Sequence, residues 1–220
     1  MEKVKKINFG TIAKKYGTVG AFIVICIFFS LSTDVFLSSS NILTVLRQIS
    51  MLAILGAGLT VVMITGRIDL SIGYGTSLLG IFCAALMVDL GVPMPVAALL
   101  TLLGGLLIGL LNGVLIAYGG IPDFIGTLGT GFLLSGINQA YTEGHPISGL
   151  PDSFEIFGNM SFLGIPTMIF IMAFWLIIIA IVLSKTRFGR HTYAIGGNKE
   201  AARVSGVRIV ATKIIACVLS

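Results

Sequence analysis

The sequence predicts an all-α, polytopic membrane protein. Hydrophobic residues make up 56% of the 220 residues and charged residues only 10%, and the mean hydropathy is +1.05. These values are typical of membrane proteins and exclude an ordinary water-soluble domain. Apolar stretches of about 20 residues, the length that crosses a hydrocarbon core about 30 Å thick, recur along the chain. We therefore expect six complete transmembrane helices and an incomplete seventh.

The expected helices follow a basic N-terminus, residues 1–16, which we assign to the cytoplasm. The six apolar stretches cover residues 17–36, 41–65, 72–88, 96–118, 124–141 and 162–183. Two prolines predict a turn at 89–95, and polar residues predict a loop at 142–159. The basic residues before the first stretch also fit a cleaved signal peptide, although that stretch is long for one and further spans follow.

The domain boundaries follow from these stretches. Residues 17–184 form the predicted transmembrane domain, residues 185–208 a cytoplasmic loop, and residues 209–220 the start of a truncated transmembrane helix. The last apolar segment, about 14 residues long, reaches only about 21 Å at 1.5 Å per residue, which is short of the bilayer thickness.

Three glycines recur at a spacing of four residues in the fourth stretch: Gly105, Gly109 and Gly113. This spacing places them on one helix face, where a neighbouring helix can approach closely. We interpret the face as a packing surface.

Lys and Arg are distributed asymmetrically along the predicted topology. If the N-terminus is cytoplasmic, Arg47 is the single basic residue outside, and twelve lie inside: Lys3, Lys5, Lys6, Lys14, Lys15, Arg67, Lys185, Arg187, Arg190, Lys199, Arg203 and Arg208. This positive-inside bias predicts a cytoplasmic N-terminus. The net charge of +5 therefore reflects topology, and we expect no nucleic-acid partner.

A short polar connection separates the second and third stretches. Arg67 and Asp69 are the only charged residues between Arg47 and Asp89. Ionisable residues at membrane depth are functional candidates, so Asp69 and Ser71 are candidates for gating a pathway. The alternative is structural, with Asp69 or Ser71 capping the third helix and Arg67 extending to the cytoplasmic surface.

The fifth stretch carries a polar stripe. Thr127, Thr130, Ser135 and Asn138 fall within an arc of about 140° at 100° per residue. Their uncharged hydroxyl and amide groups, with Asn112 of the fourth stretch, suit a neutral sugar in a transport pathway. Hydrogen bonds between neighbouring helices explain the same residues equally well.

The basic loop, residues 185–208, contains a predicted helix of about two turns. Asn198 is suited to cap its N-terminus, Glu200 lies in the first turn, and Gly206 closes its C-terminus. Its small-residue surface suits binding in a groove of another protein. The docking candidates are Gly196, Gly197, Asn198, Glu200, Ala201, Ala202, Arg203 and Gly206.

Three motifs, in the expected order, resemble those of bacterial ATP-binding cassette (ABC) transporter permeases of the ribose/xylose/galactose type. They are Gly66-Arg-Ile-Asp-Leu-Ser-Ile-Gly73, Ile121-Pro-Asp-Phe-Ile-Gly-Thr-Leu-Gly-Thr130, and the loop with Thr186-Arg-Phe-Gly-Arg190, Tyr193-Ala-Ile-Gly-Gly-Asn-Lys-Glu-Ala-Ala-Arg203 and Ser205-Gly-Val. The similarity runs from about Asn41 to the end. Where Arg67 stands, the family pattern usually has glycine.

This resemblance implies a permease of a bacterial plasma-membrane importer for a monosaccharide. It implies that a separate ATPase subunit binds the coupling loop at 185–208, that an extracytoplasmic sugar-binding protein delivers the sugar, and that a second permease copy forms a homodimer around the pathway. Family members are considerably longer, so we expect a truncated gene product or a partial sequence that inserts into lipid without transporting.

The sequence contains no nucleotide-binding, metalloprotease or hydrolase motif. Cys26, Cys83 and Cys217 stand singly in apolar surroundings, which indicates buried thiols and no metal site. We therefore expect a subunit that is not an enzyme, has no cofactor of its own and leaves ATP binding to another subunit. The alternatives are a secondary transporter or channel, and a non-conducting membrane assembly subunit.

Overall fold

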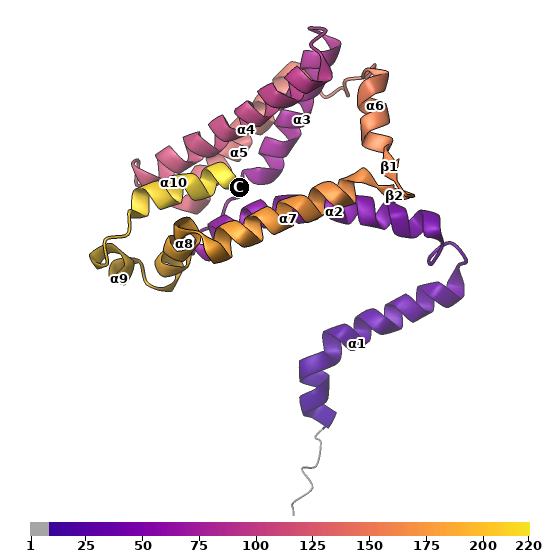
Figure 1. The fold of residues 1–220 in the computed structure, drawn as a ribbon, viewed down its shortest axis with the longest axis horizontal. Coiled ribbons are helices and arrows are strands. Elements are labelled where there is room, and N and C mark those ends of the chain that lie inside the picture. Colours follow the sequence, from indigo (N-terminus) through magenta and orange to yellow (C-terminus); the bar gives the residue numbers. More distant parts are fainter. Residues whose placement is uncertain (1–8) are drawn as a thin grey trace, which may run out of the picture. The chain divides into compact units, whose positions relative to one another are not determined.

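The computed structural model describes residues 9–220, with side chains from residue 17 onward except those of Glu155 and Phe157. The lysines of the predicted basic N-terminus, residues 1–16, thus lie outside the described side chains. The described backbone is almost entirely helical, with one two-stranded hairpin (Figure 1). The all-α class is confirmed.

The chain forms two compact units, residues 1–48 and 49–220. The first contains α1 (Phe9–Ser32) and the start of α2 (Ser39–Ile64). Asn41 stabilises the turn before α2, because its Nδ2 donates to Phe36 O at 2.8 Å. This turn separates the two helices within a few residues of the predicted boundary.

The second unit contains the rest of α2 and all later elements. The helices are α3 (Ile72–Val88), α4 (Met94–Ala117), α5 (Asp123–Thr142), α6 (Asp152–Asn159), α7 (Thr167–Lys185), α8 (Arg187–Gly197), α9 (Lys199–Val204) and α10 (Ile209–Leu219). The bounds predicted for α3 are confirmed, and those of α5 agree within one residue at each end. Pro93 is the N-cap residue of α4, so the predicted turn ends at that proline.

The segment between α5 and α7 differs from the prediction. The expected loop at 142–159 contains α6, and the expected sixth span begins with a hairpin of β1 (Ser161–Phe162) and β2 (Ile165–Pro166). The hairpin is antiparallel and turns through Leu163 and Gly164, both at positive φ. Two central residues at positive φ fit the twist of a tight hairpin. The apolar residues at 162–165 therefore belong to the hairpin, and α7 begins only at Thr167.

Three helices in the described residues are long and apolar enough to cross a membrane: α2, α4 and α7. Shorter apolar helices cover Gly17–Ser32, Ile72–Val88 and Ile209–Leu219. Helix α5 is 20 residues long, but Thr, Ser, Asn and Gln lower its apolar content. Six complete spans are therefore not confirmed.

Helices α4 and α10 pack antiparallel with their backbones close together. A methyl group at Gly113 would lie 2.9 Å from Ile214 Cα, and one at Gly109 would collide with Cys217 O. Gly105 faces α3 instead, where a methyl group would lie 3.4 Å from Leu79 Cδ1. The predicted glycine face is thus a packing surface, as expected for small residues between membrane helices.

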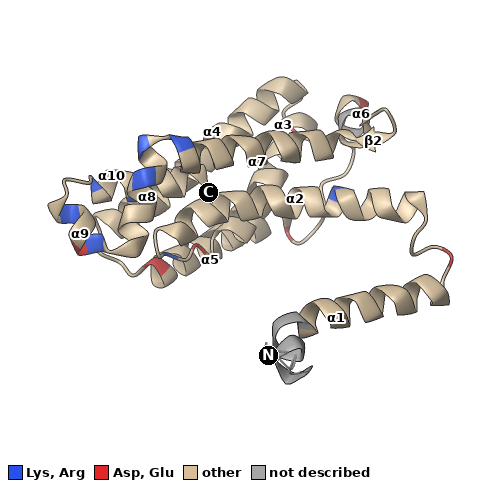
Figure 2. Ribbon diagram, turned by 60° about the horizontal axis from the view of Figure 1, so that its bottom comes forward, with Lys and Arg blue, Asp and Glu red and all other residues tan. Residues whose placement is uncertain are grey.

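One end of the second unit gathers the basic residues. Helix α8 packs against the end of α2, because a methyl group at Gly196 would collide with Ile64 O. The chain passes from α7 directly into α8 and from α9 into α10, so the last residues of α7 and the first of α10 lie near the last residues of α2. Lys and Arg cluster there, around α8, α9 and α10 (Figure 2). At the far ends of α3 and α5, Tyr141 donates to Asp89 Oδ2. This arrangement fits the alternating chain direction expected of successive membrane crossings.

Candidate functional site

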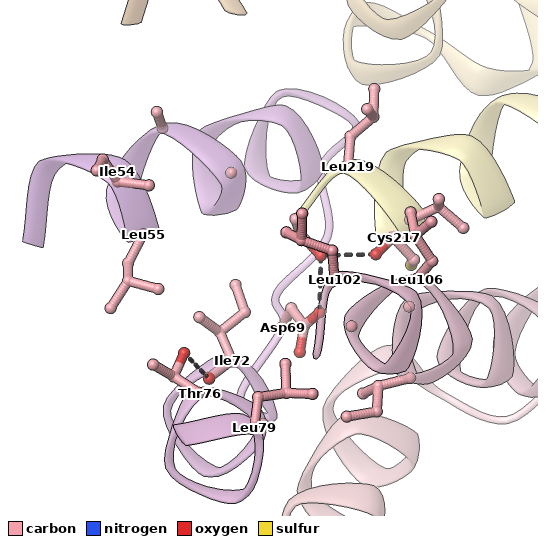
Figure 3. Close-up of a pocket in the computed structure, with 18 of the residues that line it drawn as sticks. Ile54, Leu55, Asp69, Ile72, Thr76, Leu79, Leu102, Leu106, Cys217 and Leu219 are labelled. Carbon is pink, nitrogen blue, oxygen red and sulfur yellow. Dashed lines mark hydrogen bonds between the residues drawn. The ribbon is translucent and has the colours of Figure 1, made fainter. Parts of the chain in front are cut away.

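A cavity of about 400 Å³ lies among α2, α3, α4, α7 and α10. Most of its lining is apolar, and Figure 3 shows Asp69 among side chains such as Ile72, Leu102 and Leu219. The polar residues that line it include Asp69, Ser71 and Asn112, three of the predicted pathway candidates. The structure therefore brings these three together.

Hydrogen bonds connect Asp69, Ser71 and Asn112 in one cluster. Asp69 Oδ1 accepts from Ser71 N at 2.8 Å and from Ser71 Oγ at 2.6 Å. Asn112 Nδ2 on α4 donates to Ser71 Oγ at 2.7 Å. Ser71 is the N-cap residue of α3, as one of the two predicted cap alternatives has it, but its side chain forms no cap bond, and the backbone N–H of Ser71 donates to Asp69 instead. The cluster instead fixes the α2–α3 connection to α4.

Asn112 has an unused acceptor at the cavity. Its side chain is buried, and Oδ1 has no hydrogen-bond partner among the described residues. A buried acceptor without a partner costs about 1–3 kcal/mol. A ligand hydroxyl or a water donating to Oδ1 would recover that cost.

Arg67 does not extend to the surface as predicted, and that expectation is corrected. Its side chain is only 3% exposed, and Nε donates to Asp123 Oδ1 at the start of α5. Nη1 donates to Lys213 O of α10 at 3.3 Å. The guanidinium therefore connects the α2–α3 connection, α5 and α10, which explains its burial because a buried charge requires a partner.

The polar stripe of α5 faces α3 and lies apart from the cavity lining. Thr127 and Thr130 are buried and donate to the carbonyls of Asp123 and Gly126, one turn earlier in α5. Leu70 N donates to Thr127 Oγ1 at 3.1 Å. These bonds account for both threonines as packing elements.

The remaining stripe residues are half-buried. Asn138 Nδ2 donates to Ser77 Oγ of α3 at 3.0 Å, and Asn138 Oδ1 is buried without a partner among the described atoms. Ser135 lies between these contacts. None of the four stripe residues, Thr127, Thr130, Ser135 and Asn138, lines the cavity, whereas Asn112 does. The structure therefore separates Asn112 from the stripe with which the sequence analysis grouped it.

The basic loop at 185–208 contains two helices, of which only α9 was predicted. Asn198 Oδ1 accepts from Ala201 N at 2.9 Å, which confirms the N-cap. Gly206 has φ +80, and Val207 N donates to Ala202 O at 3.1 Å, which confirms the glycine-terminated end. The missed α8 is amphipathic, and Gly189, Thr192 and Ile195 are buried on its inner face.

One predicted docking residue is not available at the surface. Ala202 is only 4% exposed, so its methyl group packs within this chain. Ala201 is exposed, and the adjacent Glu200–Arg203 ion pair is exposed on both side chains. Gly196, Gly197, Asn198 and Gly206 are also exposed. The side chain of Ala202 is therefore not available to a partner at this surface.

Comparison with known proteins gives the family. Residues 41–220 match the family described as "Branched-chain amino acid transport system / permease component". The chain belongs to this permease family. The match covers the cavity cluster, the Arg67 contacts and helices α8 and α9.

Individual relatives are import permeases of bacteria. The chain is 38% identical over 213 residues to the ribose import permease protein RbsC of Bacillus subtilis, covering 96% of this chain and 66% of the relative. RbsC of Escherichia coli is 36% identical over 202 residues, covering 90% and 62%. The autoinducer 2 import system permease protein LsrC of Salmonella typhi is 36% identical over 195 residues, covering 88% and 56%.

This permease-family chain thus spans less than two thirds of the length of these relatives. No solved structure matches it significantly. Its apolar helices and its bacterial permease relatives indicate a multi-pass inner-membrane protein.

Sequence reasoning missed two residues that hold the permease together at this site. Asp123 appeared only as part of a motif, and Lys213 contributes a backbone carbonyl, which the sequence does not mark. A pairing signal was present, since Arg67 and Asp123 both lie at predicted helix starts on one side of the membrane. Opposite charges at such positions can pair across helices.

The first prediction concerns this ion pair. Replacing Arg67 with Ala should lower the free energy of unfolding by about 2 kcal/mol, because Asp123, whose side chain is 28% exposed, would keep a partly buried carboxylate without its partner. Arg203→Ala removes the cation of the exposed pair with Glu200 and should cost below about 1 kcal/mol. Chemical denaturation in detergent measures both, and equal costs for the two variants would contradict the structural role of Arg67.

Proposed function

We propose that the chain is the membrane-spanning permease subunit of an ABC importer that moves a monosaccharide, such as ribose or a related sugar, inward. The main support is the similarity to ribose import permeases over 90–96% of the chain. The capped, exposed helix α9 at the basic end is consistent with this function, because such an importer needs a surface for its ATPase.

The proposed pathway surface includes the cavity cluster. A sugar is neutral and carries many hydroxyl groups, which both donate and accept hydrogen bonds. Asn112 Oδ1 is an acceptor that no described group occupies, and Ser71 and Asp69 provide further polar atoms beside it. The α5 residues Thr127, Thr130, Ser135 and Asn138 are secondary candidates, because their contacts are explained by packing against α3.

The proposed assembly has several partners. A separate ABC ATPase subunit binds α8 and α9 and also holds the ATP, so this chain has no catalytic site or cofactor of its own. A sugar-binding protein delivers the solute outside the membrane, and a second copy of the permease completes a homodimer in the lipid bilayer. No partner is a nucleic acid. Residues 185–208 are the cytoplasmic coupling loop of this assembly.

The two rival functions lack a supporting observation among the described residues. A proton-coupled or ion-coupled transporter places titratable groups or broken helices at the substrate site. Asp69 does line the cavity, but its Oδ1 already accepts two hydrogen bonds from Ser71, and Arg67 and Asp123 are paired with each other at the basic end. A non-conducting assembly subunit has no use for an unoccupied polar acceptor at a cavity.

A second prediction concerns orientation. With a cytoplasmic N-terminus, the coupling loop lies inside the cell and α6 outside. In a variant lacking Cys26, Cys83 and Cys217, a cysteine at exposed Ser153 should react with an impermeant thiol reagent in intact cells. A cysteine at exposed Ser205 should react only after the membrane is permeabilised. The reverse pattern would show the opposite orientation.

A third prediction concerns ATPase binding. Replacing exposed Ala201 with Arg adds a large cation to the proposed docking surface and should abolish co-purification of the ATPase without lowering the melting temperature. The matched control is Ser153→Arg, an exposed position in α6 at some distance along the chain. Retained co-purification with Ala201→Arg would remove α9 from the docking surface. Buried Ala202 is unsuitable for this test, because its replacement disturbs internal packing.

A fourth prediction tests transport itself. In cells that lack their own importer, the complete transporter should take up labelled ribose or autoinducer 2, and purified vesicles should hydrolyse ATP faster with the substrate and its binding protein. Asn112→Leu should reduce uptake at least tenfold with normal membrane insertion. The change removes both the free acceptor Oδ1 and the hydrogen bond from Nδ2 to Ser71 Oγ. Ser135→Ala should retain most of the uptake. Uptake without an ATPase would refute the assignment to an ABC importer. Full activity of Asn112→Leu would refute only the assignment of the cavity to the transport pathway.

A further inference from the structure

A second hollow lies at the basic end of the molecule, outside the cavity described above. It has a volume of about 640 Å³ and is a shallow depression, broadly open at the surface. Its lining combines an aromatic residue, two arginines and an apolar floor: Tyr118, Arg203, Val207, Arg208, Ile209, Val210, Ala211, Ile214 and Ile215. The residues come from the end of α4, from α9 and from the start of α10.

The packing of α4 and α10 places this hollow at a membrane boundary. Gly113 contacts Ile214 and Gly109 contacts Cys217, so the two helices run antiparallel. The end of α4 therefore lies beside the start of α10. Tyr118 directly follows α4, one of the helices able to span the membrane, and Arg208 directly precedes apolar α10. Exposed Tyr next to the end of a span is typical of the membrane–water interface.

The polar half of the hollow is positively charged. Arg208 is exposed and no ion pair of its guanidinium is found among the described residues. Arg203 pairs with Glu200 at 2.9 Å, but both side chains of this pair are about 70% exposed, so it is weak. Lys199 adds a third exposed cation on the same short helix. Lys199 itself lies outside the lining, so the hollow is lined by two cations, one of which is paired with the exposed Glu200.

The apolar half continues from this charge into the membrane. Val210 and Ile215 are 37% and 45% exposed on α10, and Ile214 lies between them and α4. A ligand that fits the hollow would thus have an anionic group beside the arginines and, attached to it, a hydrocarbon chain along α10. That combination of charge and apolar surface matches one ligand class, a phospholipid with a negatively charged headgroup.

We propose that the hollow between α4, α9 and α10 is a binding site for an anionic phospholipid, with its phosphate beside Arg208 and Arg203 and an acyl chain against Val210 and Ile215. The site needs no particular transported solute, so it is independent of the proposed function. Arg203 is also one of the ATPase-docking candidates, whereas Arg208 is not, so Arg208 is the residue that the test replaces.

The test measures lipid retention by the purified protein. Native mass spectrometry in neutral detergent should show a bound phosphatidylglycerol on the wild type, with affinity about fivefold lower in Arg208→Gln, since one interfacial arginine contributes about 1 kcal/mol. The matched control is Arg187→Gln, which removes an exposed cation of α8 outside the hollow. Its affinity should equal that of the wild type.

Further arms separate the possible ligands. Phosphatidylcholine with the same acyl chains should bind less tightly, and glycerophosphoglycerol, which lacks acyl chains, should not displace the lipid. Ile215→Asn should weaken lipid binding without changing the folded fraction. Equal lipid affinity in wild type and Arg208→Gln would overturn the proposal, as would an equal loss in Arg187→Gln, which would indicate unspecific attraction. Displacement of the lipid by the purified ATPase would show that the hollow is a protein contact instead.

Discussion

The buried ion pair between Arg67 and Asp123 is the constraint on which the basic end of this permease depends. Arg67 is nearly inaccessible to solvent and contacts both the start of α5 and a carbonyl of α10. Removing charges from water is expensive, so the pair persists only where the three segments hold it in place. The same residues lead directly to the cavity cluster, because Asp69 and Ser71 follow Arg67 within four positions. The ion pair therefore positions the α2–α3 connection against α4 and α5.

Hydrophobic length and local signals at helix ends were sufficient to predict α3, α5 and α9 of the second unit. The bounds of α3 and α5 and both caps of α9 followed from local signals: proline, asparagine and glycine at helix ends. The hairpin at 161–166 was missed because its apolar residues continue the hydrophobic run of α7, and hydropathy does not distinguish a turn from a helix there. Helix α8 was missed for the opposite reason, since it is amphipathic but its basic residues and glycines leave its overall apolar content low, which is typical of a loop.

The site was predictable only in part, because side-chain partners across helices are not encoded locally. Asp69, Ser71 and Asn112 were named from polarity alone, and the structure joins them in one cluster. Arg67 was expected to extend to the cytoplasmic surface, as long basic side chains near helix ends do, yet it is buried with a partner, Asp123, that lies 56 positions away. Ala202 illustrates the same limit, since a six-residue helix has an inner and an outer face that its sequence does not distinguish.

Helix α10 connects the cavity to α9, the helix that we propose as the ATPase docking site. Its N-terminus follows α9, the proposed docking helix, and its later residues Cys217 and Leu219 line the cavity. Gly109 and Gly113 leave no side chain between α4 and α10, so the two backbones pack as one rigid pair. Cys217 and Leu219 therefore line the cavity from a helix that α4 holds in place. Because Lys213 O of α10 also accepts from Arg67, α10 is joined as well to the connection that carries Asp69. Helix α10 thus connects α9, the cavity and the buried arginine within one short segment.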